Sequence, residues 1–357
     1  MSKKLLTALV AASLLFTICT TDAAGATPWK FVVMADSQGY GTDNTNTVST
    51  VMLGDMASYV AGTEQPDLVV FVGDLADPAA SQASVESALN TWKTTMAPIT
   101  NAGIALYPIR GSHDLGGNTK QTYSDVAWQN VFNLPTNGPA NEQELTYSFT
   151  HNNATFLVLD EYRLNPSPWA TVNTSWVASQ LAANSNPHIF SFEHSQMVKV
   201  EHDFCLDQCD VTARNALFAS LTGANAKVHF TGHMHLSNFT RLNNDTADPT
   251  DSDPTEDFYQ VIVAPSSQKF YDWTPEVYDG NAITGWTPHK EYNQEYQNGY
   301  AVVEVDGLDV TVTYMRKYGA GDYRAEASFS YTAVPEPATM VLLGLGATGL
   351  LIRRRRR

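Results

Sequence analysis

Acidic and imidazole side chains follow five short apolar runs in this chain. The runs are residues 30–35, 68–72, 104–109, 188–192 and 227–230. The side chains that follow them are Asp36, Asp74, Asp77, His113, His194, His233 and His235. Carboxylates and imidazoles bind divalent metal ions and move protons, although one such residue after an apolar run is usually part of a turn. Five in one chain favour a shared metal-binding or acid–base site.

The apolar runs have the composition of buried β-strands. They are short and rich in β-branched and aromatic residues, as in Leu68-Val69-Val70-Phe71-Val72. Segments 48–60 and 84–96, which lie between the first three runs, show apolar residues at helical spacing. Alternating strands and helices predict a parallel sheet, in which the carboxyl ends of the strands meet at one edge. The polar residues after the strands would converge at that edge.

The second half of the chain predicts two further helices and then a series of strands. The expected helices are 172–182 and 211–221. The expected strands, apart from the two later apolar runs, are 145–150, 155–159, 237–242, 258–264, 300–305 and 310–316. Asn152-Asn153 predicts a hairpin turn between the first two of these strands. Residues 243–257 predict an acidic surface loop, and a calcium site there would lack the Gly and terminal Glu of an EF-hand.

Both ends of the chain read as targeting segments. Residues 1–26 combine Lys3-Lys4, an apolar stretch and Ala24-Gly25-Ala26, which is typical of a cleaved signal peptide. Residues 334–357 contain Pro335-Glu336-Pro337, an apolar stretch and five arginines. This order resembles the PEP-CTERM sorting signal, which implies export, transient inner-membrane anchoring and processing by an exosortase-type enzyme. A plain C-terminal transmembrane anchor is the alternative, with the same topology. The expected location is periplasmic, cell-surface or extracellular after C-terminal processing.

The part of the chain between these segments is strongly acidic. Without Lys3, Lys4, Asp22, Glu336 and the five terminal arginines, 14 basic and 35 acidic residues remain, which is a net charge of −21. This charge argues against nucleic acid or anionic lipid as a surface-bound partner. It does not exclude phosphorylated substrates, because a bound divalent ion would dominate the local field.

Two cysteines remain outside the signal peptide, Cys205 and Cys209. In an oxidising compartment a disulfide between them is expected, since no further cysteine exists to complete a thiolate metal site.

The order and spacing of the polar residues resemble the calcineurin-like metallophosphoesterases over roughly residues 30–316. That family's pattern runs Asp-x-His, Gly-Asp-x-x-Asp, Gly-Asn-His-Asp/Glu, His and Gly-His-x-His. The most specific matches here are Gly73-Asp74-Leu75-Ala76-Asp77 and Gly232-His233-Met234-His235. The resemblance implies an α/β fold over residues 27–330, a four-layer sandwich of two mixed β-sheets flanked by helices.

The resemblance also implies two divalent metal ions. Asp36, Asp74 and His235 would hold one ion, while Asp74, His194 and His233 would hold the other, with Asp74 bridging both. Gln38 stands where the family usually has His, and Ser112 where it has Asn. An oxygen ligand from Gln38 favours Mn²⁺ or Mg²⁺, with Fe or Zn as alternatives. Ser112 is shorter than Asn, which predicts a looser second site.

The remaining two site residues are expected to be catalytic. By resemblance His113 would stabilise the transition state or protonate the leaving oxygen, and Asp77 would orient its ring. Asp77 could instead be a helix N-cap, because Pro78 follows it. The other histidines fit no motif and are interpreted as structural; they are His151, His188, His202, His229 and His289.

These features predict an exported metal-dependent phosphoesterase that hydrolyses phosphate mono- or diesters with metal-bound hydroxide at a dinuclear centre. The alternative is a catalytically weakened, metal-binding extracellular matrix or surface protein, which the Gln38 and Ser112 departures favour. A redox-active iron acid phosphatase would need a Tyr just after Asp74, where Leu75-Ala76 stands. Substrate specificity is expected in loops 115–144, 201–210 and 265–298.

Overall fold

The computed structural model describes residues 27–39, 47–117, 122–162, 169–200, 205–244, 257–273, 278 and 282–333. The expected signal peptide (1–26) and sorting segment (334–357) lie outside these residues, as do His202 and most of the acidic loop 243–257. Within the described ranges, no helix is both long and apolar enough to cross a membrane.

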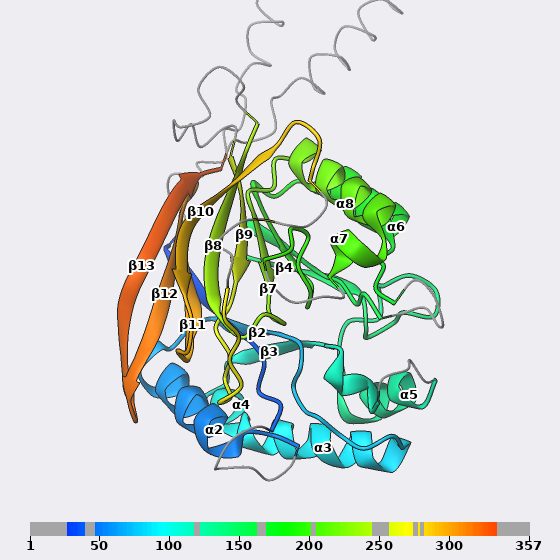
Figure 1. Ribbon diagram of the computed structural model, residues 1–357, viewed down its shortest axis with the longest axis vertical. Helices are drawn as coiled ribbons and strands as arrows, with labels where there is room; N and C mark the ends of the chain where they lie inside the picture. The colour runs from blue at the N-terminus through cyan, green and yellow to red at the C-terminus, as the bar shows by residue number, and fades with distance from the viewer. Residues whose placement is uncertain are drawn as a thin grey trace, which may run out of the picture.

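Two mixed β-sheets form the centre of the molecule (Figure 1). The first sheet has the order β13 (Asp322–Thr332), β12 (Asp309–Gly319), β11 (Gly299–Asp306), β1 (Trp29–Met34), β2 (Leu68–Val72) and β3 (Ala105–Ile109). The second has the order β10 (Thr287–Gln294), β8 (Ser237–Asn243), β9 (Asp257–Ile262), β7 (Val228–Thr231), β6 (His188–Phe192), β5 (Ala154–Val158) and β4 (Tyr147–His151). Strands β1, β2 and β3 are parallel, as are β5, β6, β7 and β9.

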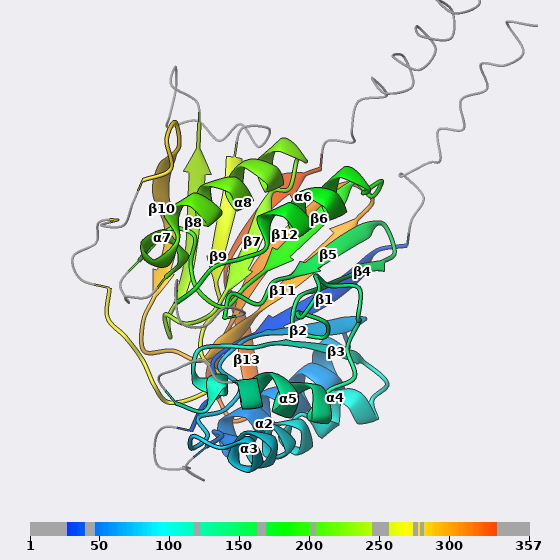
Figure 2. The same ribbon diagram turned by 90° about the vertical axis from the view of Figure 1, so that its right-hand side faces the viewer.

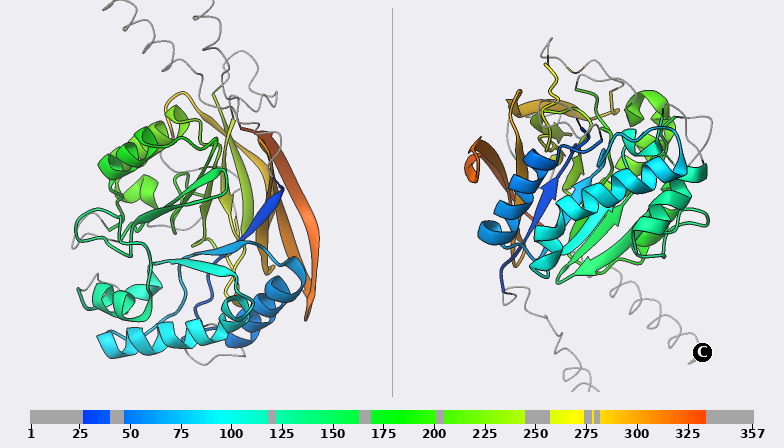
Figure 3. Two further views of the ribbon diagram at one scale, coloured as in Figure 1. Left: turned by 180° about the vertical axis from the view of Figure 1, so that it is seen from behind. Right: turned by 90° about the horizontal axis from the view of Figure 1, so that it is seen from below.

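Helices cover the outer face of each sheet. The helices on the side of the first sheet are α2 (Thr50–Tyr59), α3 (Gln82–Thr95), α4 (Ala97–Asn101) and α5 (Thr122–Val131), as Figures 2 and 3 show. The helices on the side of the second sheet are α6 (Thr174–Ala182), α7 (Leu206–Cys209) and α8 (Val211–Gly223). The α/β four-layer sandwich predicted from the sequence is therefore confirmed.

Aromatic packing holds the two sheets face to face. Phe31 on β1 is fully buried, and its ring contacts four rings of the opposite sheet at centroid distances of 4.8–6.2 Å. Those four rings belong to Phe156, Phe190, Phe192 and Phe230. All four contacts are edge-on, a geometry that adds to the free energy gained from burying the apolar surface. These contacts fix the two sheet faces relative to each other.

Backbone hydrogen bonds join neighbouring strand ends within each sheet, and the two sheets meet at this edge. The N–H of Asp36, after β1, donates to Gly73 O at 3.1 Å, after β2. In the second sheet the N–H of Gly232 donates to His194 O at 3.0 Å. A Cβ added at Gly232 would lie 2.8 Å from Val72 O, so the two sheets meet at this edge with backbone contacts. The convergence expected from the strand pattern is present.

The predicted elements match the observed ones most closely in the buried strands. Strands predicted over 68–72 and 188–192 coincide with β2 and β6. The helix predicted over 48–60 begins at Thr50 and continues into a π-helical turn, Val60–Glu64. Helices α4 and α5 and strands β10 and β13 were not predicted. The two strands carry mixed polar residues and contain many exposed positions, so neither shows a strong apolar pattern.

Phe31→Ala should lower the free energy of unfolding by about 3–5 kcal/mol, because it leaves a cavity among four aromatic rings. Val51→Ala on α2 is the control, since Val51 is 67% exposed and should change the same quantity by less than about 0.5 kcal/mol. Urea unfolding measures both. Equal effects of the two substitutions would show that Phe31 does not hold the sheets together.

Candidate metal centre

The candidate ligands stand on strained backbone just beyond the strand ends. Asp36, Asp74, His233 and His235 have φ of 54°, 52°, 67° and 52°, in the left-handed region that non-glycine residues rarely adopt. Each such residue costs about 1–3 kcal/mol and persists only where surrounding structure enforces it. All four residues are buried. Such clustering of strain is typical of functional sites.

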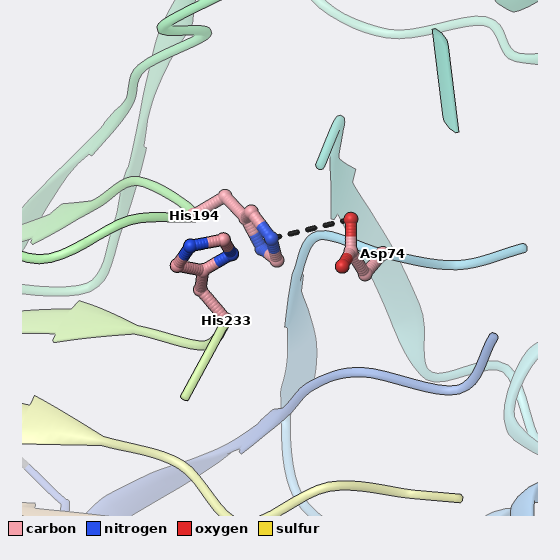
Figure 4. A group of neighbouring side chains, drawn as sticks. All are labelled: Asp74, His194 and His233. Atoms are coloured by element: carbon pink, nitrogen blue, oxygen red, sulfur yellow. Dashed lines mark ion pairs between the residues drawn. The ribbon is translucent and has the colours of Figure 1, made fainter. Parts of the chain in front are cut away.

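These ligand types form two groups that share one carboxylate. Asp74, His194 and His233 make one group, and Asp36, Asp74 and His235 make the other. In each group one ligand atom from every residue lies within 4.8 Å of the others. Figure 4 shows His194 and His233 side by side, with His194 directed at Asp74. The membership of the groups is the same as that of the two ligand sets expected by resemblance.

Hydrogen bonds on the far side of each imidazole aim its other nitrogen into the site. His194 Nδ1 lies 2.9 Å from Val72 O, and His235 Nδ1 lies 2.9 Å from Lys269 O. Carbonyls accept only, so Nδ1 donates in both rings and Nε2 can offer its lone pair. His194 Nε2 is 3.2 Å from Asp74 Oδ1, and His235 Nε2 is 3.8 Å from Asp36 Oδ1. Two acceptors this close repel each other unless a shared proton or a metal ion lies between or beside them.

The pKa values of the buried groups also indicate that positive charge would stabilise the site. Burial raises the pKa of Asp36 to about 7, and the Asp74 charge contributes to the rise. Burial lowers the pKa of His194, but the Asp74 carboxylate outweighs this effect and raises the pKa to about 10. Asp36 Oδ2 and His194 Nε2 are buried without a hydrogen-bond partner. Buried carboxylates and lone pairs of this kind fit divalent cations.

His113 and Asp77 lie beside the two ligand groups. His113 Nδ1 is 3.1 Å from Asp77 Oδ1, as expected for an orienting carboxylate, and Nε2 is 3.9 Å from Asp74 Oδ2. Burial lowers the pKa of His113, but the two carboxylates outweigh it and raise the pKa above its ordinary value. The alternative role of Asp77 as a helix N-cap is wrong, because Ser81 caps α3.

Comparison with known families bears directly on these residues. Residues 30–237 match the family described as calcineurin-like phosphoesterase, which is more than half of the chain. The chain belongs to the calcineurin-like phosphoesterase family. The matched range includes all nine expected site residues, and the resemblance stated from the motifs is confirmed. Residues 333–357 match the PEP-CTERM protein-sorting motif, which indicates export and C-terminal processing at the cell envelope.

Solved structures with the same fold come from distant proteins. A purple acid phosphatase from yellow lupin (Lupinus luteus) seeds has a TM-score of 0.61 at 15% identity, and the similarity covers 87% of this chain and 54% of that one. PhoD has a TM-score of 0.61 at 14% identity, covering 87% and 71%. GAP50, an inner-membrane-complex anchor of Plasmodium, has a TM-score of 0.56 at 12% identity, covering 87% and 91%. This chain thus spans about half of the lupin protein. No curated protein sequence matches it.

The two departures from the family pattern both lie against Asp74. Gln38 Nε2 donates to Asp74 Oδ2 at 2.9 Å and lies 2.9 Å from His235 Nε2. Gln38 Oε1 is buried without a hydrogen-bond partner. Rotating this amide by half a turn would bring the oxygen to the position between the two ligands, where it could serve a metal ion. Ser112 Oγ is 3.4 Å from Asp74 Oδ1, so the shorter side chain still reaches the site.

Asp114 is a positioning residue whose role the motifs did not reveal. Its carboxylate accepts the backbone N–H groups of Leu75, Ala76 and Gly111 at 3.2, 2.9 and 2.8 Å. These bonds tie the segment after Asp74 to the segment before His113. Burial, together with the Asp74 charge, raises the pKa of Asp114 to about 7. Two of these three partners lie 39 and 38 residues away along the chain, so the motif that contains Asp114 did not show what its carboxylate binds.

A cavity opens over the ligands and includes residues that the motifs did not indicate. Its lining residues are Asp74, Asp77, Ser112, His113, Gly117, Trp169, His233, His235, Lys269 and Tyr271. Lys269 and Tyr271 fall within loop 265–298, which was expected to set specificity. Trp169 lies outside the three loops named for that purpose. None of these three side chains belongs to a motif or a periodic segment.

Among the described residues, the histidines expected to be structural belong to neither ligand group. His229 Nδ1 lies 2.9 Å from Ser191 Oγ, and burial lowers the pKa of His229 to about 3. His188 Nε2 lies 2.9 Å from Gly307 O. The disulfide expected between Cys205 and Cys209 is wrong, because the two are not joined in the structure. Cys205 is instead buried at the start of α7, with its sulfur 3.1 Å from Gln196 Oε1.

Gly73→Ala should destabilise the centre, because Gly73 has φ +85° and an added Cβ would lie 2.3 Å from His194 Nδ1. We expect a loss of at least about 2 kcal/mol in unfolding free energy and a lower content of bound Mn²⁺. Urea unfolding and elemental analysis of the Mn²⁺-loaded protein measure these quantities. Gly62→Ala is the control, since open space surrounds its Cβ position. A Gly73→Ala protein with normal stability and metal content would contradict the close approach.

Proposed function

We propose that this chain is an exported phosphoesterase that hydrolyses phosphate mono- or diesters at a dinuclear metal centre. The observation that carries the proposal is the sharing of Asp74 between two buried ligand groups, with His113 held beside them by Asp77. Divalent ions would be held by Asp36, Gln38, Asp74, Ser112, His194, His233 and His235. Oxygen and imidazole donors of this kind favour Mn²⁺ or Mg²⁺, with Fe or Zn as alternatives.

When bound, two such ions would supply Lewis acidity toward the phosphoryl oxygens and a hydroxide nucleophile near neutral pH. The chain's own residues supply the rest. Asp74 keeps the two ligand groups together, and the burial of the groups excludes competing water. His113 Nε2 borders the cavity, where it can donate to an oxygen that gains charge during ester cleavage. Asp77 accepts from Nδ1 and holds the ring in that orientation.

The targeting segments extend the proposal to location and processing. The division into a signal peptide (1–26), a phosphoesterase domain (27–330) and a sorting segment (334–357) accounts for the composition of each part. The match to the PEP-CTERM motif supports recognition by an exosortase-type enzyme after transient anchoring in the inner membrane. The mature protein would then act in the periplasm, at the cell surface or outside the cell.

A second candidate is a metal-binding surface or matrix protein with weakened catalysis. The contact between Gln38 Nε2 and Asp74 favours it, because an amide nitrogen cannot bind a metal ion. A neighbour in fold, GAP50, is described as an anchor. The ordered pairing of His113 with Asp77 favours the enzyme, since a purely structural protein has no use for it.

Purified protein with Mn²⁺ should hydrolyse aryl phosphate esters, and Asp74→Asn should lower kcat at least about 100-fold more than Ser112→Ala does. Asp74 contributes a charge to both ligand groups, whereas Ser112 contributes one neutral oxygen at the edge. Steady-state assays with 4-nitrophenyl phosphate and its bis-ester measure the losses, with circular dichroism to establish folding.

Two outcomes would contradict this. Equal losses in Asp74→Asn and Ser112→Ala would show that the assignment of ligands is wrong. Folded wild-type protein that turns over neither ester with any divalent metal would reject the enzyme and favour the surface-protein candidate.

Asp77→Ala should lower kcat about 10- to 100-fold with little change in KM, because His113 loses its orienting partner. The loss should be larger for phenyl phosphate than for 4-nitrophenyl phosphate, since the poorer leaving group depends more on proton donation. Asp67→Ala removes a similar partner from His151, at 3.7 Å on the surface, and is the matched control. A loss that is the same for both leaving groups would argue that Asp77 acts only on stability.

A further inference from the structure

Lys269 places a positive charge on the wall of the cavity. Its Nζ lies 3.3 Å from His113 Nε2 and 5.4 Å from the centroid of the Tyr271 ring. Among the described residues that line this cavity, it is the only Lys or Arg. The other ionisable groups there are the carboxylates Asp74 and Asp77 and the three histidines. This ammonium therefore lies beside the residue that we propose to act as the acid.

The main chain of Lys269 forms a hydrogen bond with a residue of the candidate metal centre. Its carbonyl accepts the Nδ1–H of His235, a candidate ligand, at 2.9 Å. The preceding segment follows β9, and Ser266 N donates to Ala35 O at 2.8 Å, next to Asp36. The Asn298 side chain also donates to Pro265 O at 2.8 Å. These hydrogen bonds therefore position the Lys269 backbone at the cavity, beside the segments that carry the candidate ligands.

Phosphate mono- and diesters differ in the charge that they would bring to this place. A monoester carries a charge of about −1.5 to −2 near pH 7 and three non-bridging oxygens. A diester carries one negative charge and two non-bridging oxygens, and its second ester group takes the position of the third. Two oxygens suffice to face the two ligand groups. The third oxygen of a monoester would remain to be paired.

We propose that Lys269 binds this third oxygen and makes the site prefer monoesters to diesters. The inference rests on the proposed phosphoesterase function. An ammonium contact with a charged oxygen is a charge-assisted hydrogen bond, which is stronger than a bond to a neutral group. The same ammonium gains nothing from an uncharged ester group and loses water on meeting it. Lys269 therefore acts as a specificity-determining residue, while His113 acts on the leaving oxygen.

A different role for Lys269, assistance to the leaving alcohol, makes a different prediction. Both ester classes release an alcohol, so loss of that assistance would slow both equally. Selective loss of monoester hydrolysis belongs only to the proposed role. Binding of inorganic phosphate, which has no leaving alcohol, separates the two roles without any turnover.

The test compares Lys269→Met, Lys269→Arg and the control Lys290→Met. Lys290 lies on β10 over the Trp273 ring, at 5.1 Å, and is not among the cavity residues. With Mn²⁺-loaded full-length protein, kcat/KM is measured for 4-nitrophenyl phosphate and bis(4-nitrophenyl) phosphate. Lys269→Met should lose about 10- to 100-fold on the monoester, the effect of one hydrogen bond to a charged group, and less than about threefold on the diester. Lys269→Arg should retain most of the preference.

Calorimetric titration with inorganic phosphate gives the second measurement. Phosphate affinity should fall about 10- to 100-fold in Lys269→Met and stay unchanged in Lys290→Met. Equal kinetic losses on both esters, or unchanged phosphate affinity in Lys269→Met, would overturn the inference. If the wild-type protein hydrolyses neither ester, the proposed function fails separately, and phosphate affinity alone then decides the role of Lys269. Elemental analysis checks that all variants carry equal Mn²⁺.

Discussion

Burial of the Asp74 carboxylate is the constraint on which the rest of the site depends. Asp74 is 1% exposed, and burial alone would raise its pKa. The imidazoles of His194 and His113 outweigh that effect and hold the pKa of Asp74 well below its usual range. The backbone N–H of His113 and the Gln38 amide also donate to it, both at 2.9 Å. A charge stabilised from so many sides persists at neutral pH, and it creates the demand for cations at its two oxygens.

The same constraint explains the backbone around the site. Asp36 and Asp74 come from the first sheet, whereas His194, His233 and His235 come from the second. Side chains from two sheets can meet around one carboxylate only if the chain turns sharply after each strand, which the positive φ angles provide. The aromatic contacts of Phe31 keep the sheets at the distance that this meeting requires. Core packing and ligand geometry therefore depend on each other. The free energy gained by burying the aromatic core offsets the backbone strain at the strand ends.

The sequence located the strand ends at which the candidate ligands stand, because these strands bury both faces. Strand β2 is a continuous apolar run, so its end, and hence the position of Asp74, could be located to the residue. Strand β13 could not be predicted, because charged residues such as Arg324 and Glu326 interrupt its pattern. Lys269 and Trp169 lie in irregular segments, where no hydrophobic periodicity predicts which way a side chain points. Asp114 acts through backbone N–H groups that only the folded chain brings near. The Cys205–Cys209 disulfide was expected from composition and compartment, which do not determine side-chain geometry.

Charges act on two length scales in this acidic protein, and this bears on the anionic substrate that we propose for it. The chain between its targeting segments carries a net charge of −21, which repels phosphate esters at long range. Salt reduces that repulsion beyond about 8 Å at physiological ionic strength, so the field near the cavity depends mainly on the nearest groups. Those groups are Lys269 and several carboxylates, and bound cations would neutralise the carboxylates. A fixed positive charge at that point would favour the substrate with the greater negative charge. The acidic surface would oppose nonspecific binding of polyanions. Phosphate esters would then bind only in the cavity, where metal ions and the Lys269 ammonium lie together.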